Sequence, residues 1–185
     1  MKKTTKVLFT ALLAVGFGSL VHAQSATISA NATVLSQITV VNNANLNFGT
    51  VIMGQTKMID ASDNVYVSEG STAIGSANRG SFYVTAQTGS NVRLTFTLPT
   101  NLSKVGGGSL PISFPHYEET MGIVEDAYGT QDDFDLTIAY VINGFNSSWD
   151  WETSTSSFYI GGKVDATTAT AGIYTGTITL SATYN

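Results

Sequence analysis

The chain has 185 residues, no cysteine, and eight basic residues against thirteen acidic ones, for a formal net charge of −5. The lack of cysteine excludes disulfides, thiolate zinc sites and a cysteine nucleophile. The acidic balance argues against nucleic acid or an anionic membrane surface as a partner.

The first 23 residues have the layout of a secretory signal peptide. The basic start MKKTTK precedes the uncharged run VLFTALLAVGFGSLV, and Val21 and Ala23 occupy the small-residue positions of a cleavage site. The apolar run has about 15 residues, fewer than the ~20 that a membrane-spanning helix needs, which disfavours a membrane anchor. We therefore expect cleavage before Gln24 and no membrane insertion afterwards. The exported chain keeps five basic and all thirteen acidic residues, a net charge of −8.

After the signal we expect an N-terminal extension, residues 24–36, and one domain, residues 37–185. The residues between Ala26 and Val41 alternate with a period of two. One side of this pattern carries Ile28, Ala30, Ala32 and Val34. A single strand of that length would measure about 50 Å at ~3.3 Å per residue, which one small domain does not cover. The pattern therefore favours an arm followed by a first domain strand at 37–41. The alternative is a kinked edge strand that changes sheet within the same domain.

The rest of the chain predicts an all-β fold, because alternation of period two recurs and no helical period is convincing. Short strands separated by Gly- and Asn-rich turns favour a β-sandwich with Greek-key connections. The segment from His116 to Asp133 is predicted to be a loop. In FDLTIAYVI, the residues expected on one strand face are Phe134, Leu136, Ile138, Tyr140 and Ile142. Strands are expected at 45–51, 57–60, 81–86, 92–98, 110–114, 134–142, 157–164 and 172–184.

The last predicted strand, GIYTGTITLSATY, has one apolar side and one hydroxyl-rich side. The apolar side carries Tyr174, Ile178, Leu180, Ala182 and Tyr184, and the other carries threonines and Ser181. If the chain stops here, the far edge of this strand has no sequential partner, and an unpaired edge is a template for another strand. The arm of a second molecule would fit that edge. Such a head-to-tail contact need not close and generates a filament.

These two ends resemble the subunits of chaperone–usher pili and, more narrowly, a family of pilin-like secreted bacterial domains of unknown function. Gly172 is fourteenth from the C-terminus and Tyr184 is next to last, as in the end signature of such subunits. The segment LNFGTVIMG (46–54) resembles a motif near the start of the pilin-like family. Many pilins carry a disulfide, and this chain departs from them in having none.

The resemblance implies an incomplete immunoglobulin-like (pilin-like) β-sandwich that is completed by strand donation. It implies a structural subunit of a bacterial surface fibre or pilus, with cell adhesion as its setting. The subunit would pass through the periplasm to the cell surface or fimbrium. Its partners would be a periplasmic chaperone, an outer-membrane usher and like subunits in a homopolymer. The donated side chains would be Ile28, Ala30, Ala32 and Val34. The strand recognised by chaperone or partner would contain Gly172, Tyr174, Ile178, Leu180, Ala182 and Tyr184.

Enzymatic chemistry is not expected. His116 is the only histidine of the exported chain and is predicted to lie in an exposed turn, and no G-x-S-x-G elbow is present. The glycines 106–108 lack the lysine of a phosphate-binding loop. We expect no catalytic residue, no metal and no cofactor.

Two further segments have competing interpretations. The acidic stretch 118–135 contains oxygen ligands of the kind that calcium takes, but its spacing is not that of an EF-hand, and a solvated loop is favoured. Trp149 and Trp151 are two residues apart and face the same side of a strand. They support an alternative function, a monomeric secreted β-sandwich that binds carbohydrate, although packing into a core or sheet edge is favoured for them.

Overall fold

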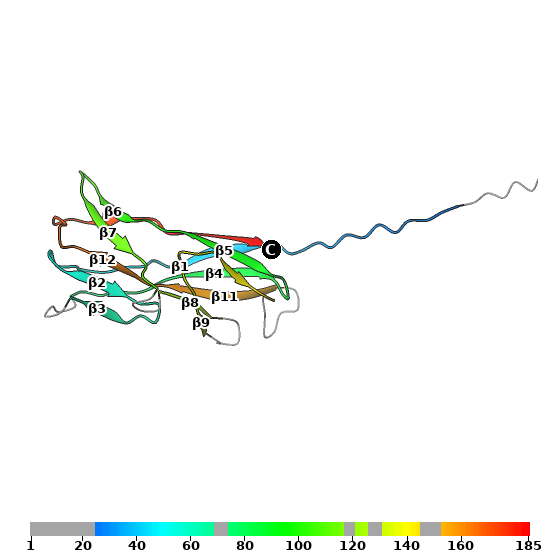
Figure 1. The fold of residues 1–185 in the computed structure, drawn as a ribbon, viewed down its shortest axis with the longest axis horizontal. Coiled ribbons are helices and arrows are strands. Elements are labelled where there is room, and N and C mark those ends of the chain that lie inside the picture. The colour runs from blue at the N-terminus through cyan, green and yellow to red at the C-terminus, as the bar shows by residue number, and fades with distance from the viewer. Residues whose placement is uncertain (1–24, 69–73, 117–120, 126–130, 145–152) are drawn as a thin grey trace, which may run out of the picture. The chain divides into compact units, whose positions relative to one another are not determined.

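The computed structural model describes residues 25–68, 74–116, 121–125, 131–144 and 153–185 (Figure 1). The chain divides into two units, residues 1–34 and residues 35–185. In the first unit the described residues 25–34 form no strand, and all their side chains are exposed. Ile28 is 95% and Val34 89% exposed. The predicted signal peptide lies outside the described residues.

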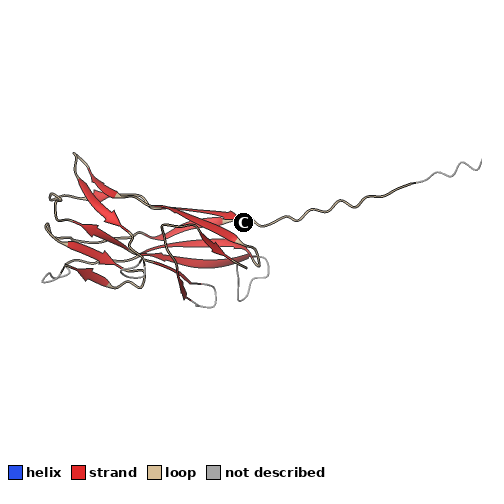
Figure 2. Ribbon diagram, viewed as in Figure 1, coloured by secondary structure: helices blue, strands red, loops and turns tan. Residues whose placement is uncertain are grey.

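The second unit is built from strands and loops, and Figure 2 shows no helix in the part of the chain that it describes. Consequently none of the described residues belongs to a helix long and apolar enough to cross a membrane. The all-β prediction is confirmed. The strands are β1 (Thr39–Ala44), β2 (Thr56–Ile59), β3 (Val65–Val67), β4 (Gly80–Gln87), β5 (Val92–Thr97), β6 (Asn101–Lys104), β7 (Ser109–Ser113), β8 (Gly122–Glu125), β9 (Gln131–Asp133), β10 (Tyr140–Ile142), β11 (Thr153–Ile160), β12 (Gly162–Asp165), β13 (Tyr174–Thr175) and β14 (Thr179–Tyr184).

The strands form three antiparallel sheets. Their orders are β1-β4-β11-β8-β9, β10-β5-β14 and β13-β6-β7-β12-β2-β3. The longest ladder joins β4 to β11, from Gly80 opposite Ile160 to Gln87 opposite Thr153. In β14 the residues from Thr179 to Tyr184 pair with β5 from Thr97 back to Val92. β1 and β14 are the outermost strands of their sheets.

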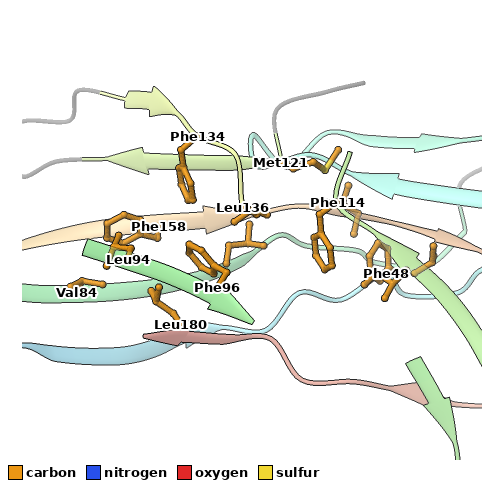
Figure 3. Packing of buried hydrophobic residues seen from close by; sticks show 14 of the residues in the cluster. Phe48, Val84, Leu94, Phe96, Phe114, Met121, Phe134, Leu136, Phe158 and Leu180 are labelled. Atoms are coloured by element: carbon orange, nitrogen blue, oxygen red, sulfur yellow. The ribbon is translucent and has the colours of Figure 1, made fainter. Parts of the chain in front are cut away.

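The core is one cluster of apolar side chains contributed by all three sheets. In β5 the buried Val92, Leu94 and Phe96 alternate with exposed residues, which is the period of a strand with one face covered. Figure 3 shows Phe96, Phe134 and Phe158 turned toward one another between the strands. The ring centroid of Phe134 lies 5.7 Å from that of Phe96 and 6.0 Å from that of Phe158, distances typical of favourable aromatic pairs.

The predicted strand 134–142 is wrong in its first half. Only Tyr140–Ile142 form a strand, and Ile138 is 63% exposed. The cause is a turn at Asp135, whose carboxylate accepts hydrogen bonds from the Thr137 backbone N–H at 2.8 Å and hydroxyl at 2.7 Å. An aspartate that binds the backbone two residues on ends a strand. Phe134 and Leu136 are nevertheless buried. The alternation of apolar residues there therefore indicates which side chains are buried, but not that the segment is a strand.

The predicted loop between His116 and Asp133 contains two short strands, β8 and β9, which extend the sheet of β11. Met121 and Ile123 are buried there, and the short length of β8 hid its alternation. Segment 157–164 is two strands rather than one, because the chain passes at Gly161 from the sheet of β4 to that of β2. Segment 45–51 makes only isolated bridges, at Asn47 and Thr50.

Two boundaries near the ends also differ from the prediction. The first strand begins at Thr39 and not at 37. The final run is divided into β13 and β14, with no strand at 176–178. Burial still alternates from the half-buried Ile178 through the buried Leu180 to the half-buried Tyr184, as the sequence predicts.

Lys57 in β2 is a buried charged residue, with 2% of its surface exposed. Its ammonium group donates to the backbone carbonyl oxygens of Thr50 at 3.1 Å and Ile74 at 3.0 Å. These bonds join two loop segments that also meet in the bridge between Thr50 and Ile74. Burial lowers the pKa of Lys57 below its ordinary value of 10.5.

This lowered pKa predicts a pH dependence of stability. Between the folded and the ordinary pKa the unfolded chain binds more protons at Lys57, so the free energy of unfolding rises with pH in that window. Lys57→Gln keeps a donor but removes the titration. The free energy of unfolding of wild type minus that of Lys57→Gln, from urea titrations between pH 7 and pH 10, should therefore increase with pH by at most about 1.4 kcal/mol per unit. Parallel pH profiles would contradict this prediction.

Candidate functional site: an uncharged groove between two strand edges

The described residues of the unit 35–185 form an open groove of about 630 Å³. One wall is formed by residues 42–49, in and after β1, and the other by residues 174–178. The floor comes from four different strands and consists of Phe82, Leu102, Ile112 and Ile160. None of the described residues that line the groove is charged.

The groove lies between two sheet edges. β1, which contributes Asn42 and Ala44 to the lining, pairs only with β4 within the part of the chain that the structure describes. β13, which contributes Tyr174 and Thr175, pairs there only with β6. Each therefore has a side on which its backbone N–H and C=O groups have no strand partner. Such edges accept an additional strand through main-chain hydrogen bonds, and pockets between them take its alternate side chains.

The wall at 42–49 is held by asparagines. A register shift between Asn42 and Ala44 ends the regular pairing of β1 with β4. The Asn42 side chain then donates to Asn45 Oδ1 at 2.9 Å, and Asn78 donates to the Asn45 carbonyl at 2.8 Å. These bonds fix the wall in a conformation that leaves the edge without a strand partner.

Phe48 and Gly49, two residues of the motif LNFGTVIMG, both line the groove. Phe48 is 9% exposed and lines the groove while belonging to the core. Gly49 has a φ of +61°, and a Cβ atom there would lie 2.2 Å from the Ser76 carbonyl oxygen. Both the positive φ and the close approach of the Ser76 carbonyl exclude a larger residue at position 49. The glycine of the motif is therefore required by the local structure.

The opposite wall begins at a turn over which Lys104 lies. The Lys104 ammonium donates to Thr170 Oγ1 at 2.8 Å and to the Ala171 carbonyl at 3.2 Å. It also lies 5.7 Å from the centroid of the Tyr174 ring. A Cβ atom on Gly172 would meet Lys104 Cδ at 2.2 Å, so glycine makes room for the lysine. The Tyr174 hydroxyl donates to the Thr170 carbonyl at 2.7 Å and closes the turn.

Outside the groove lining, a hydrogen-bonded cluster joins the start of the domain to the ends of β4 and β14. The Tyr184 hydroxyl donates to the Ser36 carbonyl at 2.6 Å and accepts from the Gln87 backbone N–H at 2.9 Å. Gln87 Oε1 in turn accepts from the Ser36 hydroxyl at 3.0 Å and from its backbone N–H at 3.3 Å. We call Ser36, Gln87 and Tyr184 the clamp.

The structure distributes the predicted partner-recognition residues over four places. Tyr174 and Ile178 line the groove, whereas Leu180 and Ala182 face the core. Gly172 lies under Lys104, and Tyr184 is in the clamp. The predicted donor residues Ile28, Ala30, Ala32 and Val34 all lie in the exposed segment 25–34.

No pattern in the sequence predicted the floor of the groove. Phe82, Leu102, Ile112 and Ile160 come from four strands, and no spacing along the chain brings them together. The sequence pattern indicated only one pair of neighbouring groove residues. Leu46 and Phe48 are two residues apart in the quoted motif and both line the same wall.

The other sequence candidates do not form a site among the described residues. Trp149 and Trp151 lie outside them, as does much of the acidic stretch 118–135. Within the described part no three His, Asp or Glu side chains gather as a metal site would require. The Thr137 hydroxyl, through its hydrogen bond, lowers the pKa of the Asp135 carboxyl. His116 is half-buried after β7, and not exposed as expected.

Comparisons with known proteins give one match. A family model described as "Domain of unknown function (DUF4402)" matches residues 38–184, from just before β1 to the end of β14. The segment 25–37 lies outside that match. Neither a curated protein nor a solved structure matches the chain.

Lys104→Ala should loosen the wall at 172–175 without unfolding the domain. The substitution removes two hydrogen bonds at a half-exposed position, so the free energy of unfolding should fall by about 1 kcal/mol. Amide hydrogen exchange at residues 172–175 should become faster, whereas the control Arg93→Ala, at an exposed position of β5, should leave it unchanged. Unchanged exchange in the Lys104 variant would show that the lysine does not support the wall.

Proposed function

The chain belongs to the DUF4402 family of domains of unknown function, and we propose that it is a pilin-like structural subunit of a bacterial surface fibre, assembling head to tail by strand donation. In this proposal residues 37–185 form an immunoglobulin-like sandwich that lacks one strand. The groove is the place of the missing strand. The observation that carries the proposal is an uncharged groove with an apolar floor, bordered by two outermost strands that have no strand partner on one side.

The proposed occupant is the segment 24–36 of another copy. Its residues 25–34 make no strand of their own, and its apolar stripe is exposed. From Ile28 to Val34 the stripe extends about 20 Å as a strand, at ~3.3 Å per residue. Burying an Ile or Val side chain contributes about 1.5–3 kcal/mol. The segment, QSATISANATVLS, is uncharged like the groove, although the exported chain is strongly acidic.

Donation between molecules leaves one arm and one groove unused at the two ends of every assembly. The contact is therefore heterologous and repeats along a fibre. The resemblance of the two ends supplies the remaining partners of the proposal, a periplasmic chaperone that protects the groove and an outer-membrane usher. A partner that binds only the folded domain also stabilises it by mass action.

The arm is tested by Ile28→Asp with Val34→Asp. Two carboxylates would have to lie against the apolar floor of an uncharged groove, which is costly, so the variant should remain monomeric in size-exclusion chromatography with light scattering. Its melting temperature should be that of wild-type monomer. The matched control is Thr27→Asp with Thr33→Asp, on the opposite side of the stripe, which should still assemble. An unfolded stripe variant would mean that the segment is an internal strand.

The groove is tested with an acetylated and amidated peptide of residues 24–36. The acceptor is the Ile28→Asp, Val34→Asp chain, whose own arm does not fill grooves. Calorimetry should show saturable binding. Because peptide and groove lining are uncharged, the dissociation constant should change by less than about twofold between 50 and 500 mM NaCl. A peptide with Val34→Asp should not bind. Absence of binding by the unmodified peptide, or strong weakening by salt, would contradict the proposed contact.

A further inference from the structure

The clamp of Ser36, Gln87 and Tyr184 lies where residues 25–34 are connected to the domain. Leu35 is the first residue of the unit 35–185, and β1 begins at Thr39. Residues 35–38 belong to no strand. Yet both backbone polar groups of Ser36 are bonded, its carbonyl to Tyr184 and its N–H to Gln87. The clamp therefore fixes this junction without a strand ladder.

The same cluster ties the junction to the last strand, β14. Tyr184 is the last residue of β14, and its half-buried ring packs against the core. Gln87 is the last residue of β4, the partner of β1. The hydroxyl of Tyr184 alone contacts both Ser36 and Gln87. Removing that one oxygen leaves the ring in place but takes away the only direct bond between β14 and the junction among those that the structure describes.

We infer that Tyr184 is a positioning residue, whose hydroxyl fixes the root of the arm and so sets where each subunit presents its arm to the next. This inference rests on the proposed function. Without the clamp the chain would first be held at Ile38, whose half-buried side chain packs against the core, and two more residues would join the free arm. At up to ~3.3–3.6 Å per residue this moves the origin of the arm by about 7 Å. A held segment loses less freedom on binding than a free one, so fixing the root favours assembly.

The first test is Tyr184→Phe, which keeps the ring and removes the hydroxyl. The Gln87 amide loses its acceptor, so its hydrogen exchange should become about tenfold faster, and a nitroxide label at position 35 should become more mobile. Tyr174→Phe is the matched control, since it also loses a tyrosine hydroxyl bond, to Thr170, but not at the clamp. It should change neither readout. Unchanged exchange at Gln87 in Tyr184→Phe would overturn the inference.

The second test separates positioning from a purely structural role. Tyr184→Phe in the otherwise wild-type chain should assemble at least about fivefold more slowly by light scattering. In the Ile28→Asp, Val34→Asp acceptor, Tyr184→Phe should bind the capped 24–36 peptide within about twofold of its parent. If peptide affinity falls in parallel with assembly, Tyr184 only supports the groove, and the positioning role is wrong. Unchanged assembly would also overturn it.

Failure of the proposed function would be seen separately. If the wild-type chain does not assemble and its groove does not bind the peptide, strand donation is refuted, and with it the role of the clamp in assembly. In that case faster exchange at Gln87 and a more mobile label in Tyr184→Phe would still establish that the hydroxyl fixes the junction. Two unchanged readouts would refute that part as well.

Discussion

The structure depends on one constraint, which is that backbone hydrogen-bonding groups beside an apolar surface need partners. Every sheet of the domain meets this requirement internally except at its outermost strands. β1 and β13 are such strands, and both line the groove. Elsewhere proteins cover edges with bulges, charges or loops. Here the lining is uncharged, and the wall after β1 is held by asparagines that bind one another and the backbone.

Polar contacts hold both walls of the groove. On the wall after β1, Asn42 and Asn78 donate to Asn45. On the other wall, Lys104 and Tyr174 hold the turn from which the wall starts. The floor between the walls is apolar. This arrangement favours a preformed groove over one that a ligand has to open.

The sequence predicted most strands that have one buried and one exposed face. Val92, Leu94 and Phe96 of β5 and Leu180 of β14 alternate with exposed residues, and the pattern alone identifies such strands. It failed at 134–139, where the Asp135 turn buries Phe134 and Leu136 without a strand. It also failed at β8, which is too short for its period to be visible. Sequence spacing describes neighbours on one strand and carries little information on sheet order.

The candidate site was predictable only at its borders. Tyr174 and Ile178 were identified from the last run, and Phe48 and Gly49 from a motif, but the floor required the tertiary structure. Likewise Tyr184 was singled out for its position near the end of the chain. The bonds from its hydroxyl to residues 36 and 87 span most of the sequence, and no local pattern foretells them.

The six-residue ladder between β14 and β5 has a mechanical consequence. A strand held beside β14 and pulled along its own axis loads main-chain hydrogen bonds in shear, so that they resist together and do not open one after another. Tension entering at Ser36 is shared between the covalent chain, which leads into β1, and the Tyr184 hydroxyl, which leads into β14 and the β14–β5 ladder. A cysteine-free chain has no covalent crosslink to limit extension. Within a fibre, its tensile strength would come from ladders oriented along the direction of pull.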